Sequence, residues 1–210
     1  MTWQMWLAFL GAAWVISLSP GAGAVASMSS GLAHGLRRGY WNILGLQLGL
    51  LLQIAVVAAG VGAVLARSAT AFTVIKWFGV AYLVYLGIRQ WRARPTETEA
   101  ETPTRGASAP ALVLRGFLVN ASNPKAVVFM LAVLPQFLEP AAPLLPQYLA
   151  IAATMVAVDV VVMTGYTGLA ARVLTLMRSP RQQSITNRVF SGLFLTAAAF
   201  LATVRRAATV

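Results

Sequence analysis

Residues 3–28 read WQMWLAFLGAAWVISLSPGAGAVASM, an apolar run interrupted once, at Ser19-Pro20-Gly21. The run can cross a bilayer, because a spanning helix needs about 20 mainly apolar residues. Pro20 removes a backbone donor and clashes with the preceding turn, whereas Gly21 leaves helical geometry without steric cost. In lipid, the freed backbone groups must be satisfied by protein or by water in a cavity. The stretch therefore predicts a transmembrane helix that is either kinked against a neighbour or unwound beside a polar cavity.

Five further apolar runs follow along the chain: 40–65, 69–88, 112–138, 144–176 and about 189–204. The 210 residues are 59% hydrophobic and 10% charged, whereas soluble domains carry roughly 25% charged residues. A bilayer solvates this apolar excess directly. We therefore predict an all-α integral membrane protein with six transmembrane helices. The sixth run is short, so we expect it to borrow flanking residues or to cross thinned bilayer.

The distribution of basic residues predicts the orientation. The net charge is +11, but the basic residues lie between apolar runs, which is typical of loops facing anionic lipid and not of a nucleic-acid partner. With six alternating spans, one side carries eleven arginines: 37, 38, 89, 92, 94, 105, 115, 172, 178, 181 and 188. The other side carries four basic residues: Arg67, Lys76, Arg205 and Arg206. The richer side should be cytoplasmic, with both termini outside. Because no basic residue precedes Arg37, the first run reads as a retained span and not as a signal peptide.

A polar, proline-containing linker at residues 93–110 divides the chain into halves, 1–92 and 111–210, of three spans each. An odd number of spans per half makes the second half enter the membrane from the opposite face. The first span of the second half is also interrupted, at Asn123-Pro124. Paired interruptions at matching positions indicate two inverted three-helix repeats with a binding site near the bilayer midplane.

Polar residues inside the spans are the candidates for function. Lys125 follows the second break, where a cation is costly unless it is functional or snorkels to the interface. Asp159 is the only acidic residue inside a predicted span. It could bind a substrate ammonium, pair with Lys125, or carry a coupling proton. Tyr166 lies on roughly the same helical face as Asp159, and Gln47 either lines a cavity or bonds across helices.

Enzyme chemistry has little support in the sequence. The chain has no cysteine, which excludes disulfides and thiolate metal sites. No cluster has metal-ligand spacing, and neither a P-loop nor a nucleophile elbow occurs. The sole histidine, His34, reads as a surface residue in a short loop. We predict a protein that is not an enzyme and needs no metal or cofactor.

Several motifs together resemble the LysE/RhtB family of bacterial amino-acid exporters. They are Ser19-Pro20-Gly21, Tyr82-Leu83-Val84-Tyr85-Leu86-Gly87, Asn120…Asn123-Pro124-Lys125 and Asp159. The similarity covers essentially the whole chain. One departure is Ala22, where the family often has a second proline.

The resemblance implies export of an amino acid or close analogue across the bacterial inner membrane, by proton antiport. The expected substrate site comprises Ser19, Pro20, Gly21, Gly23, Gln47, Asn120, Asn123, Pro124, Lys125, Asp159 and Tyr166. The half-helix ends, the two asparagines and Lys125 should face the carboxylate, while Asp159 faces the ammonium or exchanges the proton. The alternatives are a passive small-solute or ion channel, a membrane enzyme and a structural protein. Small residues on the helix faces permit a homodimer without requiring one.

Overall fold

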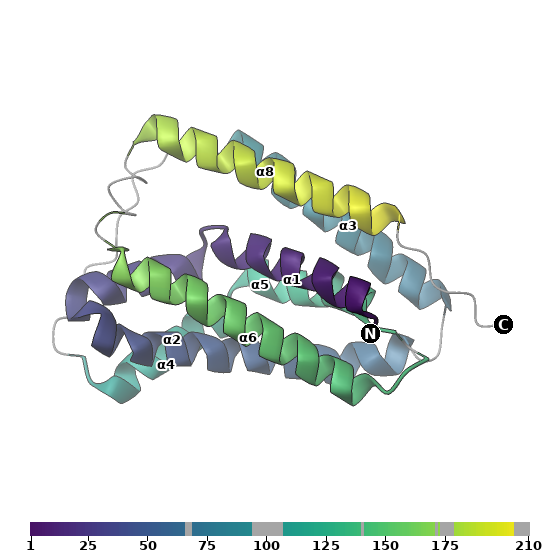
Figure 1. The fold of residues 1–210 in the computed structure, drawn as a ribbon, viewed down its shortest axis with the longest axis horizontal. Coiled ribbons are helices and arrows are strands. Elements are labelled where there is room, and N and C mark those ends of the chain that lie inside the picture. Colours follow the sequence, from purple (N-terminus) through teal and green to yellow (C-terminus); the bar gives the residue numbers. More distant parts are fainter. Residues whose placement is uncertain (66–68, 94–106, 140, 171, 173–178, 204–210) are drawn as a thin grey trace.

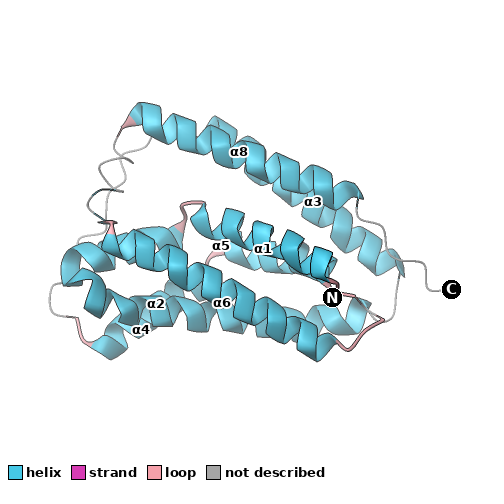
Figure 2. Cartoon of the chain, viewed as in Figure 1, coloured by secondary structure: helices cyan, strands magenta, loops and turns pink. Residues whose placement is uncertain are grey.

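The computed structural model describes residues 1–65, 69–93, 107–139, 141–170, 172 and 179–203. In this part of the chain the regular structure is entirely helical (Figures 1 and 2). The elements are α1 (Trp3–Leu18), α2 (Ala22–Leu65), α3 (Ala69–Arg92), α4 (Ala109–Ala121), α5 (Pro124–Ala132), the 3-10 helix η1 (Leu134–Phe137), α6 (Leu144–Gly168) and α8 (Pro180–Thr203). The all-α class is therefore as the sequence predicted.

Both interruptions expected from the sequence are breaks in the structure. Helix α1 ends at Leu18, and Ser19 adopts an extended conformation with φ −68° and ψ 116°. In the second half, α4 and the helical segment that follows are bent by 57° across the break. The prolines explain why neither run continues as one straight helix.

Helix α2 turns back on itself at Gly35. This residue has φ 72° and ψ 175°, a conformation that glycine adopts at little cost and side-chain-bearing residues rarely adopt. Leu46 Cδ2 lies 3.6 Å from where a Cβ on Gly23 would stand, although a straight helix would hold these residues about 35 Å apart. The first helical segment of α2 therefore ends near His34, which is partly buried beside the turn, and the second helical segment begins at Leu36, earlier than the predicted start of the second run.

Length and composition alone support fewer spans than the sequence predicted. Two of the described helices are long and apolar enough to cross a membrane, and the bent pair of α4 and the segment after it makes a third. Two helices are longer than the apolar runs that predicted them. Helix α3 continues to Arg92, and α8 begins at Pro180, nine residues before the predicted start. Helix α6 stops at Gly168, and most of the remaining predicted fifth run lies outside the described residues.

The helices form a main body and a side pair. In the body, α2 packs along α4 and α6, and α1 packs on α6. A Cβ on Gly45 would collide with the backbone of Val113, and one on Gly116 with the backbone of Asn42, so glycine lets α2 and α4 pack at close range. Helix α3 packs mainly on α8, on one side of the body (Figure 1). Ser191 Oγ of α8 donates a hydrogen bond of 2.8 Å to the Gly87 carbonyl of α3.

The described arginine-bearing segments gather at one end of the molecule. Figure 1 shows the start of α4, the end of α6 and the start of α8 at the same end. Arg38 Nη2 donates to the Ala107 carbonyl at 3.1 Å, and the Arg188 guanidinium lies 5.6 Å from the Trp91 ring centroid. Arg94, Arg105 and Arg178 lie outside the described residues.

Candidate functional site

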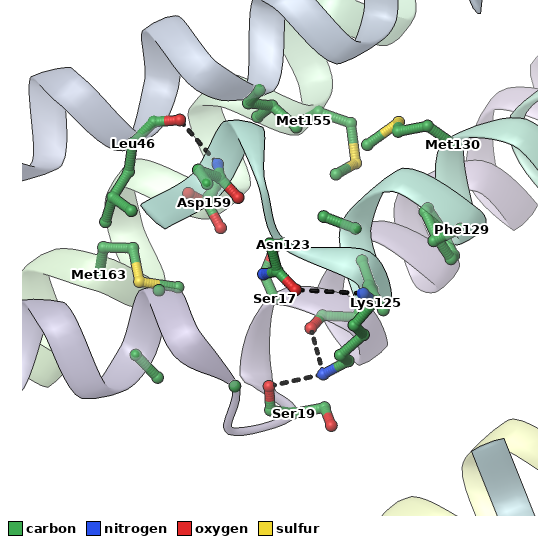
Figure 3. A pocket seen from close by; sticks show the side chains of 17 residues that line it. Ser17, Ser19, Leu46, Asn123, Lys125, Phe129, Met130, Met155, Asp159 and Met163 are labelled. Atoms are coloured by element: carbon green, nitrogen blue, oxygen red, sulfur yellow. Dashed lines mark hydrogen bonds between the residues drawn. The ribbon is translucent and has the colours of Figure 1, made fainter. Parts of the chain in front are cut away.

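A polar cavity of about 60 Å³ lies where the two helix breaks meet α2 and α6 (Figure 3). Its walls come from α1 and the start of α2, from the second segment of α2, from the α4–α5 break and from α6. The lining residues are Ile16, Ser17, Ser19, Gly21, Gly23, Ala24, Leu46, Leu50, Asn120, Asn123, Lys125, Ala126, Phe129, Met130, Met155, Asp159 and Met163.

The Lys125 side chain forms hydrogen bonds between the second break and the first. It follows Pro124 in the first turn of α5, where Asn123 Oδ1 accepts a hydrogen bond of 3.1 Å from the Lys125 backbone N–H. Its ammonium donates to the Ser19 carbonyl at 2.9 Å and to the Ile16 carbonyl at 3.5 Å. These carbonyls are freed where α1 ends, and a helix C-terminus attracts cations. The Lys125 ammonium therefore bonds to the freed end of α1 within the protein, and its depth in the bilayer, at the midplane or near the interface, stays a prediction.

Asp159 has its own partners on another wall of the cavity. Gln47 Nε2 of α2 donates a hydrogen bond of 2.7 Å to Asp159 Oδ2, and Ser17 is a second side-chain partner of the carboxyl group. No ion pair joins Asp159 to Lys125, both of which are described in full. The predicted alternative of a structural ion pair is therefore not what the structure shows. Figure 3 shows Asn123 between the two charged side chains.

The amides at the second break satisfy backbone groups. Asn120 Nδ2 donates to the Leu46 carbonyl at 2.7 Å, and the Asn120 carbonyl accepts from Gln53 Nε2 at 2.6 Å. Two backbone carbonyls thus accept hydrogen bonds from side chains of the protein. Asn123 uses its side-chain oxygen to cap α5. Both residues border the cavity, but their described hydrogen bonds stabilise the backbone at the break.

Most of the predicted site residues converge on the cavity. Seven line it: Ser19, Gly21, Gly23, Asn120, Asn123, Lys125 and Asp159. Gln47 lies behind Asp159 and orients it. Tyr166 is not in the lining; its hydroxyl donates to the Leu18 carbonyl at 2.7 Å and so fixes the end of α1. Pro20 is also not in the lining, and Pro124 begins α5. That the converging residues bind substrate stays a prediction.

Sequence reasoning missed Ser17 and the apolar part of the lining. Ser17 lies two residues before the first break, so its position beside the break could have singled it out. Met130, Met155 and Met163 also line the cavity. Methionine is common in apolar cores, where its flexible thioether fills irregular gaps, so no local signal separated these residues from packing residues.

The N-terminal ends of two helices adjoin the cavity. Helix α2 begins at Ala22, just after Gly21, and α5 begins at Pro124, just after Asn123. Both preceding residues line the cavity. Because the first N–H groups of a helix lack intrahelical partners and carry the positive end of its dipole, such ends attract anions. The cavity thus offers a cation and two helix ends to an anionic group, and a carboxylate to a cationic group.

The family model described as LysE type translocator matches residues 14–205. The chain belongs to this family. It is therefore a member of a family of membrane translocators and not of an enzyme family, and the resemblance noted in the sequence is confirmed. No solved structure matches the chain.

Two bacterial relatives match the chain over nearly its full length, and a third matches about two thirds of it. An uncharacterized membrane protein of Vibrio cholerae is 45% identical over 202 residues, which are 96% of this chain and 98% of the relative. The homoserine/homoserine lactone efflux protein of Salmonella typhimurium is 43% identical over 210 residues, 99% of this chain and 100% of the relative. The leucine efflux protein of Klebsiella pneumoniae is 28% identical over 134 residues, 64% of this chain and 63% of the relative.

Proposed function

We propose that this protein is a secondary transporter that exports an amino acid or a close analogue across the bacterial inner membrane. The observation that carries the proposal is the cavity itself: Lys125 and Asp159 line it together and are not paired with each other. The efflux names of two relatives, for homoserine or its lactone and for leucine, favour the same cargo class.

The two charges fit the two ends of a zwitterion. The Lys125 ammonium carries three N–H donors, and the Ile16 and Ser19 carbonyls accept from it. The remaining donor and the start of α5 would receive the carboxylate of the cargo. The Asp159 carboxylate, held by Gln47, would receive the ammonium. Moving a zwitterion through lipid is costly, and this cavity would replace its hydration with fixed partners.

The proposed architecture is six spans in two inverted repeats, residues 1–92 and 111–210, joined by a linker at 93–110. The packing supports this arrangement, because the main contacts between the two halves occur in matching pairs. Helix α4 of the second half packs on α2 of the first, and the counterpart of this contact is the packing of α1 and α2 on α6. Helix α5 packs on α3, and the counterpart is the packing of α1 on α8. Helices α3 and α8, which correspond to each other, pack together. The clustering of arginines at one end supports the proposal that this end is cytoplasmic and that both termini face outward.

Proton antiport is the proposed energy source, with Asp159 as the proton carrier. A carboxyl group can take a proton when the ammonium leaves it and give the proton up when the ammonium returns, so one residue can couple both movements. Gln47 and Ser17 are its described side-chain partners, and an amide and a hydroxyl can bond to either protonation state of a carboxyl group.

Counterflow in liposomes tests the proposal. Purified protein would be reconstituted with an excess of unlabelled amino acid inside, and uptake of the labelled amino acid followed across a panel that includes homoserine, threonine and leucine. A carrier is expected to give saturable uptake above the equilibrium level for some members of the panel, and an imposed proton gradient should drive net movement.

The same preparation distinguishes the alternatives. A passive channel would equilibrate label without overshoot and without saturation. Absence of counterflow for every amino acid, from protein shown to be folded by its thermal transition, would refute amino-acid export. Uptake indifferent to the proton gradient would refute proton antiport and leave facilitated exchange.

A further inference from the structure

A second, apolar cavity adjoins the polar one. The polar cavity, at about 60 Å³, has room for a few water molecules and holds polar partners only for the head of an amino acid. The second cavity is a groove of about 390 Å³ between α1 on one side and α8 on the other. It is lined by Ala8, Gly11, Ala12, Val15, Ile16, Leu83, Phe129, Val133, Phe137, Leu193, Phe194, Thr196 and Ala197.

The groove begins where the polar cavity ends. Ile16 and Phe129 line both of them. The Lys125 ammonium, which belongs to the polar cavity, lies 5.8 Å from the ring centroid of Phe194, which lines the groove. Phe129 and Phe194 are each 2% exposed, so the inner end of the groove is deep in the protein. From Ile16 the groove follows α1 to Ala8, a length of about 12 Å along the helix.

We propose that this groove is a second subsite, which takes an apolar side chain of the cargo while its ammonium and carboxylate stay in the polar cavity. The inference rests on the proposed function. A zwitterion held between Asp159 and Lys125 has no room for a large side chain in the polar cavity, and the shared wall of Ile16 and Phe129 gives access to apolar space. The cargo class is therefore amino acids with an aliphatic or aromatic side chain, in addition to small ones.

Phe194 divides the two subsites. Its ring lies beneath the Lys125 ammonium and also lines the groove. A large side chain would pass beside this ring along the shared wall of Ile16 and Phe129, and small cargo would stay in the polar cavity. The groove is also open between Gly11 and Leu193, both of which are exposed. A lipid acyl chain in the groove is therefore the competing occupant.

Filling the groove from either wall tests the assignment. A Cβ on Gly11 would have no neighbour within 4 Å, so Gly11→Leu adds bulk at a groove-lining position where the backbone has space for a side chain. Thr196→Phe fills it from α8. The matched control is Gly192→Leu, at a position in α8 that also has no neighbour within 4 Å and does not line the groove. Thermal transitions would show that each variant is folded.

We expect wild type and Gly192→Leu to carry leucine and phenylalanine as well as homoserine in counterflow. In Gly11→Leu and Thr196→Phe, the half-saturating concentration of leucine should rise about ten- to a hundredfold, as expected for a side chain that is no longer buried, while that of homoserine stays unchanged. Unchanged leucine transport in both groove variants would overturn the subsite and leave the groove to lipid.

The two proposals fail in different ways. Wild-type protein that carries homoserine but no amino acid with a large apolar side chain would overturn the groove assignment alone. Wild-type protein that carries no amino acid at all would overturn the exporter proposal and the groove assignment together.

Discussion

Replacing Asp159 by asparagine removes a charge from the proposed ammonium site and leaves its shape. Asparagine can still accept the hydrogen bond that Gln47 Nε2 donates to Asp159 at 2.7 Å, so folding should be little affected. The cargo ammonium loses a hydrogen bond to a charged acceptor, a bond worth about 1.5–3 kcal/mol. At 1.4 kcal/mol for each factor of ten, the half-saturating concentration should rise about 10- to 100-fold.

The assay is counterflow at varied substrate concentration, with and without a proton gradient. Glu139→Gln is the matched control, because Glu139 is half-exposed and its partner is the amino-terminus, at 3.4 Å, outside the cavity. The hydroxy-acid analogue of the cargo lacks the ammonium, so its inhibition constant should be the same in Asp159→Asn and in wild type. An Asp159→Asn variant with wild-type half-saturation and a wild-type response to the gradient would refute the role of Asp159.

Three further predictions concern packing and orientation. Gly116→Ala places a Cβ against the backbone of α2 and should destabilise the protein by about 1–3 kcal/mol, as overpacking does; an unchanged thermal transition in detergent would show that the helices separate freely. Tyr166→Phe removes the hydrogen bond to the Leu18 carbonyl and should lower the stability of the fold by about 0.6 kcal/mol. The maximal transport rate should fall more than the half-saturating concentration changes, because α1 loses its anchor beside the cavity; an unchanged transport rate would contradict this. In intact cells, a membrane-impermeant thiol reagent should label Trp3→Cys and not Arg92→Cys, and the reverse pattern would overturn the orientation.

The sequence was sufficient to place the two helix breaks, because the chemistry of proline and glycine is local. Pro20 and Pro124 each lack a backbone N–H, and each ring clashes with the preceding turn, so both interrupt a helix locally. It was also sufficient to single out Lys125 and Asp159, because charge inside an apolar run is costly in any arrangement of helices. The structure brings both residues to one cavity.

The partners of these residues could not be predicted, because they depend on how distant segments pack. Lys125 bonds to the carbonyls at the end of α1, a position set by the meeting of two breaks more than 100 residues apart. Tyr166 shares a helical face with Asp159, yet its hydroxyl bonds to Leu18, because helical periodicity gives a direction and not the neighbour found there. The Gly35 turn carried only the weak signal of a glycine after a helical run.

The central claim is that the cargo occupies the polar cavity between the two breaks, and protection of a single cysteine tests it most directly. The natural chain has no cysteine, so Ser19→Cys provides one thiol in the cavity wall. Ser19 is 4% exposed, and its hydroxyl has no hydrogen-bond partner among the described residues, so the substitution breaks no bond there. The matched control is Ser184→Cys, in the first turns of α8 and outside the cavity.

The measurement is the rate at which a small maleimide alkylates each variant in proteoliposomes as the transported amino acid is added. We predict that the amino acid slows alkylation of Ser19→Cys, with half-protection at the concentration that half-saturates counterflow, and leaves Ser184→Cys unchanged. An alkylation rate at Ser19→Cys that is constant up to saturating amino acid would contradict the claim that the cargo occupies this cavity.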